Sequence, residues 1–437
     1  MKRKIFSMFD YVLILLVLVL VSLCVIFIYS SSINSDGIMV TNEYVKQIIW
    51  ASIGFVLMIA ITIYDYRKLE PISVYLFIIL IGLLIYTRLF GRYVNGAYSW
   101  IGIGDIGIQP SEFGKVFYIL FLAHFLAQSV NMPPLKRFFV ACCILLLPMG
   151  LILIQPDLGT ASVYLPIFLI MCFIAGIRLK YLLYVTGLGV LTIFFAILPV
   201  WNSVIRATPL AAVSILTDIK LRAILIFALL TIAVIGFILR RFFHFPKWLS
   251  TIAHVLILIA LSLIFSLVLG KVLKEYQIMR LIIFMNPDVD PQGAGWNIIQ
   301  SKIAIGAGGV FGQGFLRGTQ SHFRFLPQQS TDFIFSILSE ELGFVGGIVV
   351  FSLYLFILLK ILYVVKKCSN RFGMYICSGI FAMFSFHFLI NVGMVMGMMP
   401  ITGIPLLFLS YGGSSLLTAM SCIGLIMNIN CRKSDLY

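Results

Sequence analysis

Charged residues are scarce in this chain of 437 residues, since Asp, Glu, Lys and Arg together make up only 11% of it. A soluble domain contains about 25% charged residues. Hydrophobic residues reach 61%, and the mean hydropathy is +1.10. This composition excludes a soluble enzyme, a disordered protein and a nucleic-acid-binding protein of the usual kind, so nucleic acid is not expected among the partners.

Acidic residues are the scarcer of the two charged classes, with 16 against 31 basic residues. In membrane proteins, Lys and Arg collect in the short loops on the cytoplasmic side. Placing the N-terminus in the cytoplasm assigns most basic positions to short loops on that side: Lys2, Arg3, Lys4, Arg67, Lys68, Lys136, Arg137, Arg178, Lys180, Arg240, Arg241, Lys247, Lys360, Lys366, Lys367, Arg371, Arg432 and Lys433. Both termini are therefore predicted to be cytoplasmic.

Several chemical motifs are missing. The eight cysteines lack metal or disulfide spacing, and no phosphate loop, zinc-protease helix or serine-nucleophile elbow occurs. Residues 306–314 are glycine-rich but lack phosphate-loop spacing, and a tight re-entrant or surface turn is expected there.

Long apolar runs extend from end to end of the chain. They predict an all-α polytopic membrane protein, because the runs are continuous and do not alternate as barrel strands do. About twelve transmembrane helices are expected in one integral membrane domain, 1–437, beginning with an uncleaved first span: 11–30, 46–64, 71–87, 113–128, 138–154, 160–177, 181–200, 221–239, 250–270, 338–361, 373–395 and 405–429.

Two long polar loops fall on the extracytoplasmic side, at 88–112 and at 271–331, the second lying before the last three helices. Loops of this length in a compact bundle usually have a function. The second contains Asp288 and Asp290 in a stretch rich in proline and glycine, which suits either a rigidly held general base or a solvated Asx turn.

Other charged residues leave two interpretations open. Glu112 and Lys115 are spaced i, i+3 at the start of a helix. They form either a functional pair in a cavity or a pair that snorkels to the membrane interface. Arg280 and Lys302 suit a phosphate-bearing substrate or are solvated loop charges. His387 is a proton relay or a histidine packed between helices. Further acidic residues are expected to face the bundle interior or to begin a helix: Asp157, Asp332, Glu340 and Glu341.

Several long motifs resemble, in order, those of the SEDS family, the RodA/FtsW peptidoglycan glycosyltransferases. They are NGAYSWI with QPSEFGK, QPDLGTA, the stretch from QIMRLIIFMNPDVDPQGAGW to TDFIFSILSEELG, and GMMPITGIPLLFLSYGGSS. The versions at 318–321 and 403–405 resemble the elongation branch, RodA, more than FtsW. Compared with the family, residues 201–270 are interpreted as an inserted helix pair with its flanks. Because a pair of helices crosses the membrane twice, the insertion leaves Asp290 on the same side of the membrane as in the family.

The resemblance implies that Asp290 is the catalytic carboxylate and that Glu112 and Lys115 line a central cavity. Substrate-binding residues are expected along the matching motifs, at Trp100, Glu112, Lys115, Arg280, Gln300, Ser301, Lys302, Thr319, Gln320, Ser321, Asp332 and Ser414.

The implied reaction joins lipid II to an undecaprenyl-pyrophosphate-linked glycan through inverting β-1,4 bonds during cell elongation, at the bacterial cytoplasmic (inner) membrane. A divalent cation, Mg²⁺ or Mn²⁺, is a possible cofactor, and a class B penicillin-binding transpeptidase and other elongation-complex proteins are the expected partners. Two alternatives stay open: a lipid II flippase, and a non-catalytic scaffold for a transpeptidase.

Overall fold

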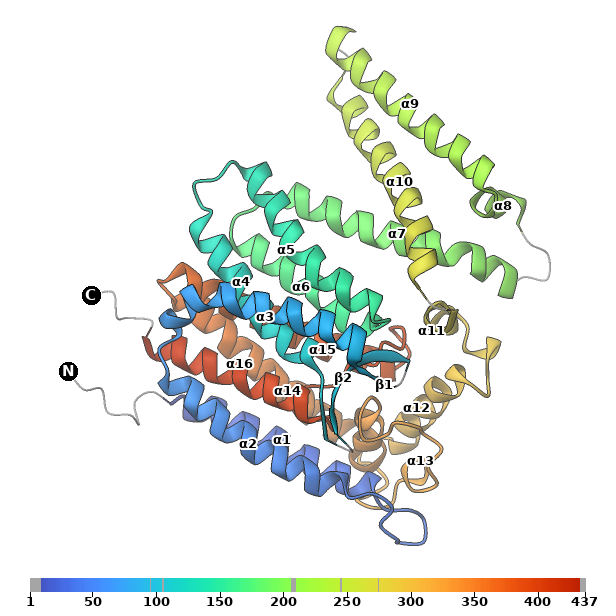
Figure 1. Cartoon of the computed structure of the whole chain (residues 1–437). Coiled ribbons are helices and arrows are strands. Elements are labelled where there is room, and N and C mark those ends of the chain that lie inside the picture. Colours follow the sequence, from blue (N-terminus) through green and yellow to red (C-terminus); the bar gives the residue numbers. More distant parts are fainter. Residues whose placement is uncertain are drawn as a thin grey trace. The chain divides into compact units, whose positions relative to one another are not determined.

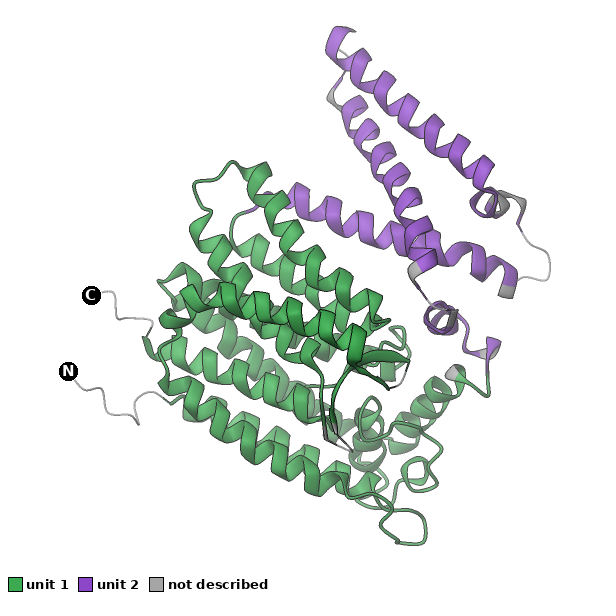
Figure 2. Ribbon diagram, in the orientation of Figure 1, with its two compact units in different colours: residues 1–176, 291–437 green, residues 177–290 purple. Residues whose placement is uncertain are grey.

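The computed structural model describes residues 9–94, 96–103, 106–205, 210–243, 246–273 and 275–432. Helices dominate it (Figure 1). The chain divides into two compact units (Figure 2): unit 1 comprises 1–176 and 291–437, and unit 2 comprises 177–290. The predicted boundaries at 88–112, 201–270 and 271–331 stay predictions.

Unit 1 is a bundle of helices whose apolar faces pack on one another. Its helices are α1 Tyr11–Ser31, α2 Glu43–Ile63, α3 Leu69–Phe90, α4 Pro110–Gln128, α5 Pro134–Ile154, α6 Leu158–Ile174, α12 Ala294–Gly308, α13 Thr319–His322, α14 Ile334–Lys367, α15 Arg371–Val395 and α16 Gly413–Arg432. The last of these is the most buried, because it packs on α2, α4, α14 and α15. Residues 405–412 are not helical, so the last predicted helix began eight residues too early.

A small antiparallel sheet interrupts the otherwise helical fold. Its strands are β1 Arg92–Val94, β2 Ala97–Ile103 and β3 Ile106–Ile108, in the order β1-β2-β3. The sheet lies inside the predicted outer loop 88–112. Its first turn is tight, since Gly96 has a φ of +93°, a conformation that glycine adopts without steric cost.

Unit 2 consists of α7 Leu179–Ile205, α8 Ala211–Thr217, α9 Ile219–Phe243, α10 Lys247–Val272, α11 Glu275–Met285 and a 3₁₀ turn at Pro287–Val289. Val213, Leu216 and Leu263 form its buried apolar cluster. Arg222 ties α8 to α10, because its guanidinium donates to the carbonyl of Leu216 at 3.0 Å and to that of Leu263 at 2.7 Å. Helices α9 and α10 occupy the range predicted as a helix pair.

Ten helices of the described residues are long and apolar enough to cross a membrane. Each of the twelve predicted ranges overlaps a helix, but two helices fall outside the ten: α4 contains Glu112 and Lys115, and α6 has only 17 residues. The chain is a multi-pass membrane protein, and the number of crossings stays a prediction.

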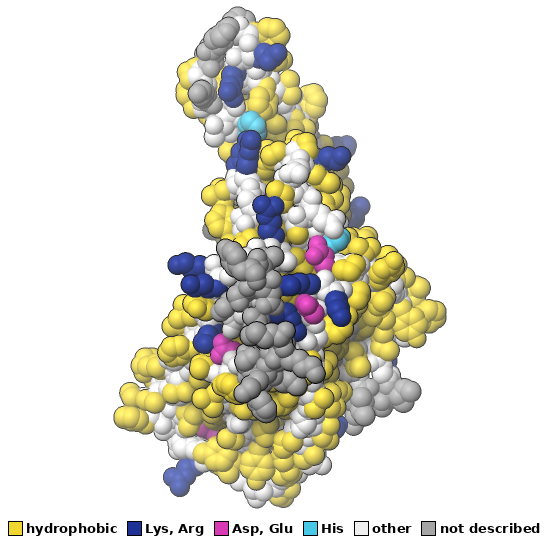
Figure 3. Space-filling model, turned by 90° about the vertical axis from the view of Figure 1, so that its left-hand side faces the viewer, with side chains coloured by type: hydrophobic (Ala, Val, Ile, Leu, Met, Phe, Trp, Pro, Cys, Tyr) yellow, Lys and Arg dark blue, Asp and Glu magenta, His cyan; other side chains and the backbone are white. Residues whose placement is uncertain are grey.

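Ion pairs connect the ends of neighbouring helices at one end of unit 1. Lys360 of α14 lies 3.0 Å from Asp10, which caps α1, and Arg432 of α16 lies 3.8 Å from Asp65, which follows α2. Lys and Arg side chains lie among hydrophobic ones on the side where α1 begins and α16 ends (Figure 3). The structure thus brings together residues predicted to share one side of the membrane; the assignment of that side to the cytoplasm stays a prediction.

Helix α14 is broken at Gly343, which has a φ of +66° and a ψ of −159°. The glycine-rich segment 308–314 lies in the break and replaces the missing helical hydrogen bonds. Gln313 and Gly314 donate to the carbonyls of Glu340 and Glu341, and the carbonyls of Gly309 and Val310 accept from Phe344 and Val345, all at 2.9–3.1 Å. A Cβ at residue 312 would stand 2.0 Å from the Glu341 carbonyl, so this backbone contact requires glycine.

Candidate functional site

The first turns of α4 hold a buried ion pair. Pro110 occupies the start of the helix, where a missing N–H costs nothing, and Glu112 follows in the first turn, where the helix dipole favours an acid. The Lys115 ammonium donates to Oε1 of Glu112 at 2.7 Å. Glu112 is 4% exposed and Lys115 is fully buried, so the pair does not snorkel to the interface.

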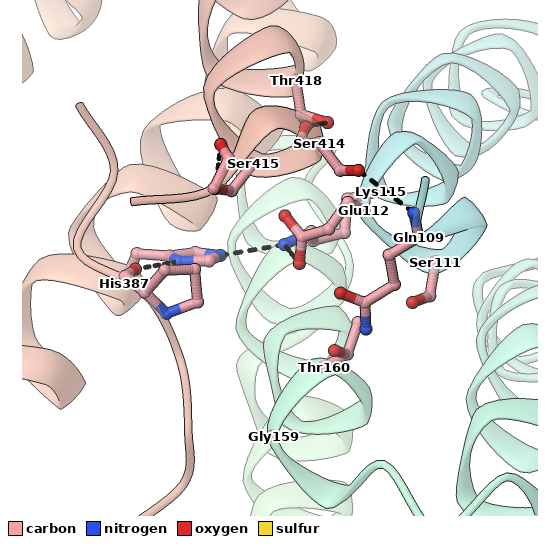
Figure 4. A network of polar contacts seen from close by, with 12 residues as sticks. Gln109, Ser111, Glu112, Lys115, Gly159, Thr160, His387, Ser414, Ser415 and Thr418 are labelled. Carbon is pink, nitrogen blue, oxygen red and sulfur yellow. Dashed lines mark hydrogen bonds and ion pairs between the residues drawn. The ribbon is translucent and has the colours of Figure 1, made fainter. Parts of the chain in front are cut away.

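His387 of α15 is the second partner of Lys115 (Figure 4). Its Nε2 lies 3.1 Å from Lys115 Nζ, and its Nδ1 lies 2.9 Å from the carbonyl oxygen of Pro405. Because an ammonium can only donate, Nε2 accepts and Nδ1 carries the proton. The ring is therefore neutral in this arrangement. Of the two interpretations left open for His387, the packed histidine is the one seen, but it packs directly on the ion pair.

Three motifs that are far apart in the sequence meet beside this pair. Gln109 donates from its backbone to Ser414 Oγ at 3.1 Å and from its side chain to Asp157 Oδ2 at 2.9 Å. Asp157 caps α6, accepting from the backbone N–H and hydroxyl of Thr160 at 3.0 and 2.8 Å. Burial raises the pKa of the Asp157 carboxyl, and the hydrogen bonds from Thr160 oppose that rise.

Glycines allow these segments to approach each other closely. A Cβ at residue 114 would stand 2.4 Å from Leu80 Cδ1 and 2.8 Å from the Tyr164 hydroxyl. A Cβ at residue 159 would stand 2.3 Å from the carbonyl oxygen of Thr402. The glycines of QPSEFGK and QPDLGTA thus have a packing reason, since a side chain at either position would push α3 or the 401–412 segment away.

The ion pair keeps unused hydrogen-bonding capacity. Glu112 Oε2 is buried without a partner among the described residues. The Lys115 ammonium has three N–H donors, and the described residues take two of them, through Glu112 and His387. A buried polar atom without a partner costs about 1–3 kcal/mol, so the pair has room for a water or a ligand that supplies a donor and an acceptor.

The residues predicted on α12 have separate surroundings. Ser301 is buried, and its hydroxyl donates to the Val395 carbonyl at 2.7 Å and bonds to Ser336 at 2.8 Å. Gln300 is buried beside it. Lys302 is exposed, and its chain lies against the backbone of Gly397, where a Cβ would stand 2.2 Å from Cε.

The residues predicted at 319–321 contact a carboxylate of the protein itself. Glu340 of α14 accepts from the hydroxyl of Thr319 at 3.2 Å and from the backbone N–H groups of Gln320 and Ser321 at 2.8 and 3.3 Å. Glu340 is fully buried and holds α13 against α14, which agrees with the expectation that this acid faces the bundle interior. Asp332 lies just before α14, and its carbonyl accepts from Asn391 at 3.0 Å.

Asp290 and Arg280 belong to unit 2. Asp290 follows the 3₁₀ turn Pro287–Val289 and is half-buried. Arg280 lies on α11 with its guanidinium carbon 5.6 Å from the ring centroid of Tyr276. Pro287 and Pro291 flank residues 288–290 and restrict the backbone that presents the Asp290 carboxylate.

Trp100 lies on β2, half-buried, with its ring against Gly107 of β3. Strand β3 is followed at once by Gln109 and α4, so the small sheet connects Trp100 to the ion pair through a short stretch of chain. The described residues contain no group of three or more His, Cys, Asp or Glu side chains that could hold a metal ion.

These features define a class: a polytopic membrane protein with a buried, partly unsatisfied charged site inside its helix bundle. A family model described as "Cell cycle protein" (FtsW/RodA/SpoVE) matches residues 10–211 and 203–435. The chain belongs to this family, and the predicted resemblance is confirmed.

Known relatives cover nearly the whole chain. It is 54% identical over 433 residues to the peptidoglycan glycosyltransferase RodA of Treponema pallidum (strain Nichols), covering 98% of each. It is 31% identical over 427 residues to the peptidoglycan glycosyltransferase MrdB of Escherichia coli (strain K12), covering 98% of this chain and 95% of that one. A solved structure described as coordinating polymerization and crosslinking in a peptidoglycan synthase complex matches with a TM-score of 0.68 at 23% identity, covering 98% of each chain. That structural likeness confirms the fold class.

Sequence reasoning missed two contributors to the site. Gln109 begins the QPSE motif, three residues before Glu112. The available signal was that Gln-Pro followed closely by an acid occurs twice, in QPSE and in QPD. The carbonyl of Pro405 orients His387, and no side-chain pattern could reveal a backbone acceptor.

Proposed function

We propose that this chain is a peptidoglycan glycosyltransferase that polymerises lipid II into β-1,4-linked glycan strands. The single observation that carries the proposal is the full-length identity of 54% to a protein with that activity in its name. The buried pair Glu112–Lys115, with its unused donor and acceptor, supports it from the geometry.

In this mechanism Asp290 accepts the proton from the 4-hydroxyl of the acceptor sugar as that oxygen attacks the anomeric carbon of the donor. The attack inverts the anomeric centre, and the prenyl pyrophosphate of the donor leaves. A positioned general base contributes about 10²–10⁴-fold to the rate. Positive charge for the pyrophosphate comes from Lys115, Arg280 or Lys302, and it stabilises the negative charge that develops in the transition state.

A divalent cation, if used, would bind together with the pyrophosphate of the substrate. Mg²⁺ is commonly held by one or two carboxylates together with substrate phosphates, and the described residues offer no larger acidic group for it. No step of the mechanism runs through it. The proposed partner is a crosslinking transpeptidase of the penicillin-binding type, supported by the peptidoglycan synthase complex among the similar structures, with other elongation-complex proteins.

The test is polymerisation of dye-labelled lipid II by the purified full chain, with and without a class B transpeptidase. Asp290→Asn is expected to abolish polymer at an unchanged melting temperature, while Asp288→Asn, two positions away, is expected to keep most activity. Glycan synthesis by a well-folded Asp290→Asn protein would remove Asp290 from the mechanism. If the unmodified chain translocates lipid II but makes no polymer, the proposed polymerase activity is wrong and the flippase alternative is supported.

A further inference from the structure

The hairpin β1–β2 carries an exposed aromatic pair that the proposed chemistry does not use. Tyr93 and Tyr98 are direct cross-strand partners, with ring centroids 5.0 Å apart and an interplanar angle of 52°. Tyr93 is 59% exposed and Tyr98 is 38% exposed. The tight turn at Gly96 and the strand pairing fix both rings on a short, rigid element.

Cations accompany the pair. The Arg88 guanidinium carbon lies 5.7 Å from the ring centroid of Tyr98, which holds that ring in place. At the end of α3, Tyr86 and Phe90 form a second exposed aromatic contact, with centroids 5.2 Å apart. Residues 86–103 contain Arg88 and Arg92 but no Asp or Glu. The surface is therefore aromatic and positively charged.

The pair is also connected to the charged site. Tyr98 and Trp100 lie two residues apart on β2, on either side of an irregularity in the strand register, because Tyr98 pairs with Tyr93 and Trp100 pairs with the adjacent Arg92. Trp100 packs on Gly107 of β3, and Gln109 follows two residues later with its bonds to Asp157 and Ser414. The tyrosine pair therefore belongs to the short sheet that leads directly into α4 and the Glu112–Lys115 site.

We infer that Tyr93 and Tyr98 form a platform for the glycan strand, on which sugar rings of the growing β-1,4-linked polymer stack as the strand leaves the site. This inference rests on the proposed function. Sugars with equatorial substituents present faces of axial C–H groups, which pack on the electron-rich faces of aromatic rings. Arg88, beside Tyr98, suits the carboxylates that the peptide substituents of such a strand carry.

A platform that retains the strand makes synthesis processive, because the product stays bound between additions. The test is a double substitution, Tyr93→Leu with Tyr98→Leu, compared with Tyr93→Phe and Tyr98→Phe, which keep both rings. Polymer length is measured on gels at equal consumption of labelled lipid II. Loss of two stacked rings is expected to shorten the strands about three- to tenfold, while the Phe pair keeps the length of the unmodified chain.

Tyr363→Leu is the matched control. Tyr363 of α14 is also exposed and also lies under a cation, with Lys367 Nζ 6.0 Å from its ring centroid, but at the end of α14 far in sequence from the hairpin. Its substitution is expected to leave strand length unchanged. Equal shortening by Tyr363→Leu or by the Phe pair would overturn the inference, as would full-length strands from the Leu pair, which would mark the tyrosines as membrane-interface anchors.

Direct binding separates this inference from the proposed function. Saturation-transfer NMR with chitohexaose, a soluble β-1,4 polymer of N-acetylglucosamine, is expected to show binding to the detergent-solubilised full chain and to the Phe pair, and reduced binding to the Leu pair. Equal binding by all three would refute the platform. A chain that binds chitohexaose in this pattern yet makes no polymer would instead refute the proposed polymerase.

Discussion

Lys115 Nζ lies 3.1 Å from Nε2 of His387, joining helices whose residues stand 272 positions apart in the chain. The contact sets the histidine tautomer and uses one of the three donors of the ammonium. It also explains why a cation is tolerated at full burial, since both Glu112 and the histidine ring accept from it. The ion pair is thus a three-residue unit built from α4 and α15.

The charge balance of this unit gives the first prediction. Neutralising only Glu112 or only Lys115 leaves a buried charge without its counter-charge, which costs about 3–5 kcal/mol when burial is deep. The double variant Glu112→Gln with Lys115→Met is expected to regain expression and melting temperature but not polymerisation, because in the proposed mechanism Lys115 also meets the pyrophosphate. Stability and glycan synthesis are measured on both single variants and the double. Near-normal turnover by the double variant would reduce the pair to a packing device.

His387 is expected to contribute through its two hydrogen bonds. His387→Leu removes an acceptor from Lys115 and leaves the Pro405 carbonyl without its donor, which costs about 1–3 kcal/mol. Ser385→Ala is the control on the same helix, because the Ser385 hydroxyl is buried without a partner among the described residues. Thermal unfolding of the two purified variants should show a clear loss for His387→Leu only. Equal melting temperatures would contradict the assigned bonds.

Gly159 is expected to tolerate no side chain. In Gly159→Ala the new Cβ would stand 2.3 Å from the Thr402 carbonyl oxygen, so backbone must shift, and overpacking of this kind costs about 1–3 kcal/mol. Gly150→Ala in α5 is the matched control, since no atom lies within 4 Å of its Cβ position. That change should be neutral or stabilise by up to about 1 kcal/mol, as alanine favours helix. Equal effects on melting temperature would refute the close approach.

The orientation in the membrane is open to cysteine labelling. In a background without the partly or fully exposed thiols Cys142, Cys143 and Cys431, Ser203→Cys and Arg317→Cys are expected to react with an impermeant reagent added outside intact cells. Arg241→Cys is expected to react only after the membrane is opened, because the basic 240–247 segment is predicted to be cytoplasmic. Labelling of Arg241→Cys from outside would refute the inserted helix pair.

Spacing in the sequence predicted part of the site and missed the rest for physical reasons. An i, i+3 acid and base on one helix must meet, so the Glu112–Lys115 pair was predictable. The contact with His387 depends on how α15 packs, which no local pattern encodes. The Asn95-Gly96 dipeptide between strand-like residues was a usable hairpin signal inside 88–112. The start of the last predicted helix was misjudged because 405–409 is apolar without being helical.

The break at Gly343 has a consequence for biogenesis. Helix α14 has 34 residues, so an unbroken helix would measure about 51 Å at 1.5 Å per residue, far more than the roughly 30 Å of a bilayer core. Residues 344–367 suffice to span by themselves. Residues 334–342 depend on segment 308–314 for the hydrogen bonds that the break leaves open. Insertion and completion of this helix are therefore separable: the second half is long enough to insert as an ordinary span by itself, and the first half takes its final shape only when segment 308–314 packs into the break.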